Sequence, residues 1–188
     1  MVLYHITYNL KHDGIFIPKI PSKRLNVYNY NENTDMIIVK NNILEEDQIK
    51  RVCVSKTVEG CLSSMPRANF FLKESFKKKG NKFKVFKIDT KKLNIDNVLD
   101  EKFLYQKDLV RDAEVTKECW ITESFIVSEV DSFIIEVESF EETILSVIPF
   151  RLKEKLLTGD IVEELKRESL HVLKISNLKY KRIVNSSL

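Results

Sequence analysis

The alternation of hydrophobic and polar positions along the chain predicts many short strands and only a few helices. In residues 2–8 alternate side chains share a face, so that His5 would lie on one side of a strand and Tyr4 and Ile6 on the other. Residues 51–56, Arg-Val-Cys-Val-Ser-Lys, are rich in β-branched and small apolar side chains, which favours a buried strand. Both segments are expected to contribute strands to the core.

The same two periodicities predict the other elements. Thr57 is a predicted N-cap for a short helix over residues 58–65, which Pro66 ends. Further strands are predicted at residues 36–39, 82–89, 103–105, 118–122, 132–138 and 171–184. A second helix is predicted over residues 69–79, before Gly80, and partly helical spacing over residues 140–167. Loops and connections are predicted at residues 16–24, 26–33 and 91–98.

Short strands interleaved with few helices predict an α+β fold. A length of 188 residues suits a single domain. We expect a strand-rich core over residues 1–140 and a C-terminal helical and strand extension over residues 141–188.

Charge gives little reason to expect a nucleic-acid partner. The 31 Lys+Arg nearly balance the 28 Asp+Glu, for a net charge of +3. Lysines do cluster in residues 73–92, with phenylalanines among them, a pattern that can track phosphates and stack bases. The favoured interpretation is a solvated face of a helix and a strand, so nucleic-acid binding is not expected.

The cysteines and the N-terminus predict a cytoplasmic protein. Cys53, Cys61 and Cys119 form no CxxC pair, and an odd number is a poor disulfide framework. The three histidines are scattered, so no metal is expected. No basic-then-apolar leader or long apolar run predicts secretion or a membrane span. The Lys, Asn, Ile and Glu bias is compatible with an accessory protein of a bacterium or virus.

One polar residue in each of three predicted strands is the main lead to function: His5, Ser55 and Glu118. Polar groups in apolar strands need buried partners or face a cleft. Taken singly, each is more commonly structural: a satisfied core histidine, a helix-capping serine and a solvated glutamate. Phosphate-binding glycine loops, nucleophile elbows and zinc-protease motifs are absent from the sequence.

Together the three segments resemble the ADP-ribosyltransferase superfamily, in its branch with a His–Tyr–Glu arrangement. Leu3-Tyr-His-Ile-Thr is similar to that branch's first strand, and residues 51–62 resemble its strand that runs into a helix. Glu118-Cys-Trp-Ile-Thr, followed by Phe133-Ile-Ile-Glu-Val, is similar to its last motif. The order and approximate spacing agree over residues 1–140. The resemblance implies a compact mixed, mainly antiparallel sheet with a few helices.

The resemblance also implies a function: binding of NAD as a substrate, with transfer of ADP-ribose to a macromolecular target or hydrolysis of NAD, and no metal. Glu118 would stabilise the oxocarbenium character that develops on the ribose. His5 would hold ribose or nicotinamide groups, and Ser55 would support Glu118 or the nicotinamide ribose. The implied NAD-binding residues are His5, Thr7, Ser55, Phe70, Phe71 and Tyr105, the last three as candidates for stacking on nicotinamide.

The chain departs from the family pattern at two places. Ile6 stands where the family has the glycine that leaves room for a dinucleotide, and residues 52–54 hold no tyrosine. These departures favour an alternative: a non-catalytic module on the same scaffold that binds a nucleotide-derived small molecule or a host protein, for example as an inhibitor. Sequence alone leaves the catalytic and non-catalytic hypotheses open.

Overall fold

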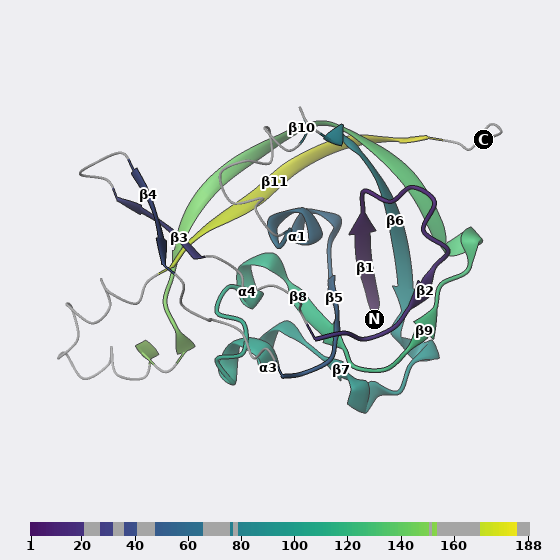
Figure 1. Ribbon diagram of the computed structural model, residues 1–188, viewed down its shortest axis with the longest axis horizontal. Coiled ribbons are helices and arrows are strands. Elements are labelled where there is room, and N and C mark those ends of the chain that lie inside the picture. Colours follow the sequence, from purple (N-terminus) through teal and green to yellow (C-terminus); the bar gives the residue numbers. More distant parts are fainter. Residues whose placement is uncertain are drawn as a thin grey trace.

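A seven-stranded antiparallel sheet forms the centre of the protein in the computed structural model (Figure 1). The structure describes residues 1–20, 27–31, 36–40, 48–65, 76, 79–150, 152–153 and 170–183. The strands of this sheet are, in spatial order, β11 (Leu170–Ile183), β10 (Ser132–Val147), β6 (Lys82–Asp89), β1 (Val2–Thr7), β5 (Val52–Ser55), β8 (Glu118–Ile121) and β7 (Val98–Leu99). Every neighbouring pair that carries this order is antiparallel. The predicted α+β class with a mainly antiparallel sheet is confirmed.

Smaller elements surround this sheet. Two further pairs of strands are β2 (Ile15–Phe16) with β9 (Phe125–Ile126), and β3 (Val27–Asn31) with β4 (Met36–Lys40). The helices of the described chain are α1 (Val58–Ser63), α3 (Glu101–Gln106) and α4 (Ala113–Thr116). Three 3-10 turns are η1 (Thr90–Lys92), η2 (Ile95–Asn97) and η3 (Glu129–Asp131).

The two faces of the main sheet have different covers. One, the helical face, packs Ile6 and Val85 against α1, and Trp120 against α3 and α4. The other, the flap face, packs Leu3 and Phe86 under the β2–β9 pair. We call residues 14–16 and 125–127, which form that pair and its ends, the flap. Side chains alternate between the two faces along each strand, so a residue's position in the strand decides its environment.

Helix α1 lies unusually close to the sheet. Thr57 caps it as predicted, because its side chain accepts a hydrogen bond from the Gly60 backbone N–H. A Cβ on Gly60 would stand 2.1 Å from Ser55 Oγ and 2.0 Å from the Thr116 carbonyl oxygen. Any larger residue would collide with both β5 and α4, so this glycine sets the distance between α1 and its neighbours.

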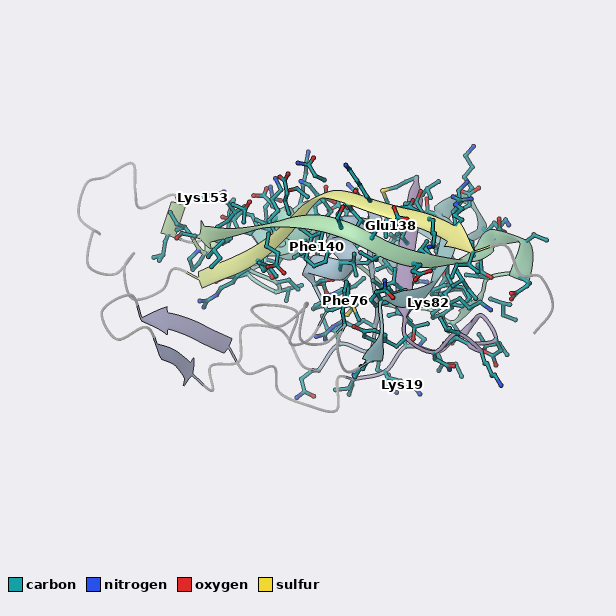
Figure 2. All side chains as sticks on the ribbon, turned by 90° about the horizontal axis from the view of Figure 1, so that it is seen from above. Lys19, Phe76, Lys82, Glu138, Phe140 and Lys153 are labelled. Atoms are coloured by element: carbon teal, nitrogen blue, oxygen red, sulfur yellow. The ribbon has the colours of Figure 1, made fainter. Side chains whose placement is uncertain are left out.

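The long strands β10 and β11 form a ribbon that passes over α1 (Figure 1). Their pairing shifts register twice, around Ser139, as expected where β-bulges bend a ribbon. Bending brings Leu173 and Ile175 into the core beneath the ribbon, and Ser63 of α1 accepts a hydrogen bond from the Ile175 N–H at 3.0 Å. In Figure 2, Phe140 on this ribbon lies above Phe76, with the two rings edge to face and their centroids 5.6 Å apart.

Most predicted strands are confirmed, and three local predictions are wrong. Residues 27–31 form strand β3 rather than a loop. Residues 103–105 lie in helix α3, because the Asp100 side chain caps the Phe103 N–H at 2.8 Å. Residues 140–147 continue β10 instead of turning helical, because they pair with β11. The predicted helix over residues 69–79 falls almost wholly outside the described residues.

Candidate functional site

Ser55 and Glu118 lie side by side on the helical face. Ser55 is the direct partner of Tyr4 on β1 and of Glu118 on β8. Residues directly opposite each other on antiparallel strands point their side chains to the same face. The structure therefore brings together two of the three polar residues that the sequence singled out, on three adjacent strands.

The Ser55 hydroxyl is fully buried and bound within the protein. It donates to the Thr116 carbonyl oxygen at 2.8 Å and accepts from the Thr57 N–H at 3.3 Å. The first bond joins β5 to the end of α4, and the second fixes the turn into α1. The geometry of Ser55 is that of a residue that holds helices on a sheet.

The Glu118 carboxylate is also buried, with only 6% of the residue exposed. Its Oε1 accepts a hydrogen bond from the Trp120 indole N–H at 2.8 Å. The two residues are two positions apart on β8, so they share a face and the indole can reach the carboxylate. A charge-assisted bond of this kind holds the carboxylate in one orientation.

Arg51 completes the buried polar group. Its guanidinium carbon lies 3.9 Å above the centroid of the Trp120 ring, and its Nη1 donates to the Ile49 carbonyl oxygen at 3.1 Å. The residue is 5% exposed, so its cation–π contact with Trp120 is largely desolvated. Sequence reasoning missed Arg51 and Trp120. The sequence signal for Arg51 was its spacing of two positions from Cys53 and four from Ser55. In an extended chain this spacing places the three side chains on one face.

Cys53 is the exposed residue of β5 on the helical face, and we call this exposed position the opening over β5. It sits in the middle of β5, paired with Trp120 of β8, yet it is exposed to solvent. Its neighbours on β5 are buried, so the prediction of a buried strand holds for them and fails for Cys53. Helices α1 and α4, which meet at Gly60 and Thr116, cover the next residue on this face, Ser55. A central-strand side chain that reaches solvent is where a ligand can approach a sheet.

His5 lies on the flap face, away from Ser55 and Glu118. Its Nδ1 donates to the Cys53 carbonyl oxygen at 2.9 Å, and its ring contacts Phe16 edge-on at 5.0 Å. Burial lowers the pKa of His5; the carbonyl contact opposes this effect and the nearby His12 adds to it. The structure thus separates the histidine from the other two predicted catalytic residues by the thickness of the sheet.

The remaining predicted NAD-binding residues do not gather around Glu118. Thr7 is on the same face as His5, and its hydroxyl accepts the Asn9 N–H at 3.1 Å. Tyr105 is 2% exposed in α3, and its hydroxyl donates to the Ile148 carbonyl oxygen at 2.7 Å. This buried ring packs against Phe150 and is closed to a nicotinamide. Phe70 and Phe71 lie outside the described residues.

The other two cysteines are structural. Cys61 and Cys119 are buried, and burial raises the pKa of both thiols, that of Cys119 to about 12. Neither forms a disulfide. In the described part of the chain no group of three or more His, Cys, Asp or Glu is placed to hold a metal ion. No helix among the described residues is both long and apolar enough to span a membrane.

The predicted lysine-rich segment contributes its aromatics to the core. Phe83 and Phe86 of β6 are 0% and 1% exposed, so neither can stack on a base. Lys84 is buried with them and is held by Glu129 at 2.9 Å. Residues 82–89 form the predicted strand, but the prediction of one wet face is wrong, because β6 is buried on both faces.

Comparison with known proteins adds no identity. No protein-family model, curated protein or solved structure matches this chain. The functional interpretation therefore depends on the chain's own residues.

Proposed function

We propose that this protein is a non-catalytic binding module that takes NAD or a related nucleotide-derived molecule at the opening over β5. The observation that carries the proposal is the exposure of Cys53 in a strand that is paired on both sides, next to the buried Ser55 and Glu118. The ligand class is inferred from the motif resemblance at residues 3–7, 51–62 and 118–122 to ADP-ribosyltransferases.

Three contacts favour binding over transfer. The Ser55 hydroxyl and the Glu118 carboxylate are each bonded to a protein group and buried. The predicted histidine, His5, packs against Phe16 on the far face. A catalytic carboxylate must meet the developing charge on the ribose, and an orienting histidine must reach the same substrate. This arrangement supports the loss of transfer chemistry with retention of the scaffold.

A second candidate function is NAD-dependent transfer or hydrolysis, with Glu118 as the carboxylate that stabilises the ribose. It is favoured by one observation, the direct pairing of Ser55 with Glu118 on adjacent strands. For this function the Trp120 indole would have to keep the carboxylate oriented toward the opening beside Cys53. The two candidates differ in whether nicotinamide is released.

Thermal-shift titration with NAD, ADP-ribose and nicotinamide tests the proposed site. A ligand at 100 times its Kd stabilises the folded state by about 2.7 kcal/mol, or roughly 5–10 °C for a chain of this size. A Cys53→Trp variant fills the opening and is expected to lose the shift. The matched control is Ile126→Trp on β9, a position that is 74% exposed on the flap, which should keep it.

Incubation with NAD labelled in its nicotinamide distinguishes the candidates. The binding proposal predicts that the parent protein releases no more label than buffer does. Release by the parent and its loss in Glu118→Gln, whose amide oxygen can still accept the Trp120 N–H, would establish the second candidate instead. An unchanged melting temperature with all three ligands would overturn the proposal of a nucleotide-derived ligand.

A further inference from the structure

Two histidines and Phe16 form a closely packed cluster on the flap face. The His12 ring stacks on Phe16 with centroids 4.9 Å apart, and the His5 ring meets Phe16 edge-on at 5.0 Å. Phe16 in turn stacks on Phe125 at 4.9 Å, across the β2–β9 pair. Both imidazoles therefore contact the aromatic residue that holds the flap against the sheet.

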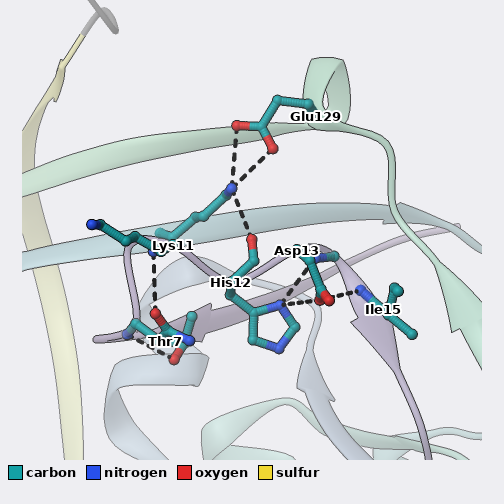
Figure 3. Close-up of polar contacts among 9 residues, drawn as sticks. Thr7, Lys11, His12, Asp13, Ile15 and Glu129 are labelled. Carbon is teal, nitrogen blue, oxygen red and sulfur yellow. Dashed lines mark hydrogen bonds and ion pairs between the residues drawn. The ribbon is translucent and has the colours of Figure 1, made fainter. Parts of the chain in front are cut away.

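The His12 ring accepts a hydrogen bond from the turn that follows it. The Gly14 N–H donates to its Nδ1 at 3.0 Å, and only an unprotonated nitrogen can accept that bond (Figure 3). The His12 carbonyl oxygen accepts from Lys84 Nζ at 3.0 Å, so the segment is also fixed through its backbone.

Gly14 links the imidazole to the flap. Its carbonyl oxygen accepts the Val127 N–H at 2.9 Å, next to the Ile15–Ile126 pair. Its φ of +82° and the 2.3 Å that would separate a Cβ from the Val127 oxygen admit only glycine here. The His12–Gly14 bond thus fixes the turn from which β2 starts.

Protonation of His12 would disturb two bonds of this turn at once. If Nδ1 carried a proton, it would be a hydrogen-bond donor facing another donor, the Gly14 N–H, and the bond between them would be lost. Asp13 Oδ1 lies 3.6 Å from Nδ1 and now accepts the Ile15 N–H at 3.0 Å. A charged imidazole attracts that carboxylate away from Ile15. The turn then loses the bonds to both Gly14 and Ile15.

Charged and titratable groups surround the two imidazoles. Lys84 lies against the segment from β6, is 6% exposed and is paired with Glu129 of η3 (Figure 3). His5 approaches from β1 and Asp13 from the same loop. A positive charge on His12 would therefore lie near Lys84, whose partner Glu129 is already in an ion pair. It would also lie near the imidazole of His5.

We propose that the His12–Gly14 bond is a proton-sensitive latch, which keeps the flap closed at neutral pH and releases residues 14–16 and 125–127 from the sheet in mild acid. Release would uncover Leu3, Phe86 and Phe125, which are 0%, 1% and 9% exposed when the flap is closed. The latch acts on the face of the sheet opposite to the proposed ligand site.

Hydrogen exchange measured by mass spectrometry at pH 7 and pH 5 tests the latch. After correction for intrinsic exchange, the peptides that cover the flap are expected to lose about tenfold or more in protection at pH 5. Those from β5 and β8 are expected to lose clearly less, since only the lowered pKa of His5 acts on them through the stability of the whole fold. Equal loss of protection throughout the sheet, or no loss in the flap, would overturn the latch.

His12→Asn is the decisive variant, because Asn Oδ1 takes the place of Nδ1 as an acceptor and does not titrate. In this variant the flap peptides are expected to be protected from hydrogen exchange at pH 7. At pH 5 their protection should fall by less than threefold. A loss as large as in the parent would contradict the proposal. Asp13→Asn is a second variant that keeps an acceptor for Ile15 and removes the carboxylate that a charged His12 attracts. It should reduce the loss at pH 5, and an unchanged or larger loss would also contradict it.

Discussion

Replacement of Gly60 by alanine tests the close packing of α1 on the sheet. The added Cβ would stand 2.1 Å from Ser55 Oγ and 2.0 Å from the Thr116 carbonyl oxygen, distances that real Cβ atoms do not show. These two atoms are joined by the 2.8 Å bond from Ser55, so relief of one contact moves the other. Neither is the flexible end of a long side chain, and the helix or its neighbours must shift.

Two opposing effects set the size of the change. Alanine is favoured over glycine in a helix by about 1 kcal/mol. Overpacking costs about 1–3 kcal/mol, and loss of the buried Ser55 bond costs about 1–3 kcal/mol more. We expect Gly60→Ala to lower the free energy of unfolding by about 2–4 kcal/mol, and the melting temperature by about 5–15 °C.

Urea unfolding, followed by far-ultraviolet circular dichroism, measures this change. Glu59→Ala is the matched control, because Glu59 is the one residue of α1 that is not buried, and its loss should change stability by less than about 1 kcal/mol. If Gly60→Ala is as stable as the parent, or more stable by the 1 kcal/mol that helix propensity alone predicts, the described contact between α1, β5 and α4 is wrong.

Three further predictions concern the polar groups. Trp120→Phe removes the indole donor from the buried Glu118 carboxylate and should lower the free energy of unfolding by about 1–3 kcal/mol, whereas an unchanged urea midpoint would refute the bond. Because burial lowers the pKa of His5, the unfolded chain takes up a proton first, and stability present above about pH 6.5 is lost as pH falls below it. In His5→Asn the free energy of unfolding, measured with urea, should depend less on pH below about pH 6.5. The same pH dependence as in the parent would refute the lowered pKa of His5. One thiol, that of Cys53, should react rapidly with a chromogenic disulfide under native conditions; three fast thiols would contradict the burial of the other two.

Local hydrophobic patterns predicted the strands in which hydrophobic and polar residues alternate. They failed where contacts with distant parts of the chain determine the secondary structure. The N-terminal strand and residues 82–89 alternate, and both were predicted correctly. Residues 140–147 have helical spacing, but pairing with β11, far along the chain, keeps them extended. Residues 103–105 are a different case, because Asp100 is a cap signal visible in the sequence that would have favoured the helix.

The candidate site was half predictable for the same reason. Motif order brought Ser55 and Glu118 into consideration, and the structure pairs them. Which side chains of β1 and β5 point to the same side of the sheet depends on the register of the two strands. A shift of one residue would move every side chain of a strand to the opposite face. The pairing of Tyr4 with Ser55 places His5 on the far face, a result that alternation within one strand could not give.

Fluorescence of Trp120 provides the most direct test of the central claim, that a nucleotide-derived ligand binds at the opening over β5. It is the one tryptophan of the chain, and it is paired with the exposed Cys53. Titration of the parent with NAD or ADP-ribose should change the Trp120 emission along a saturable curve, and Cys53→Leu should weaken the binding. Emission that stays constant while calorimetry also detects no heat of binding for either ligand would contradict the account.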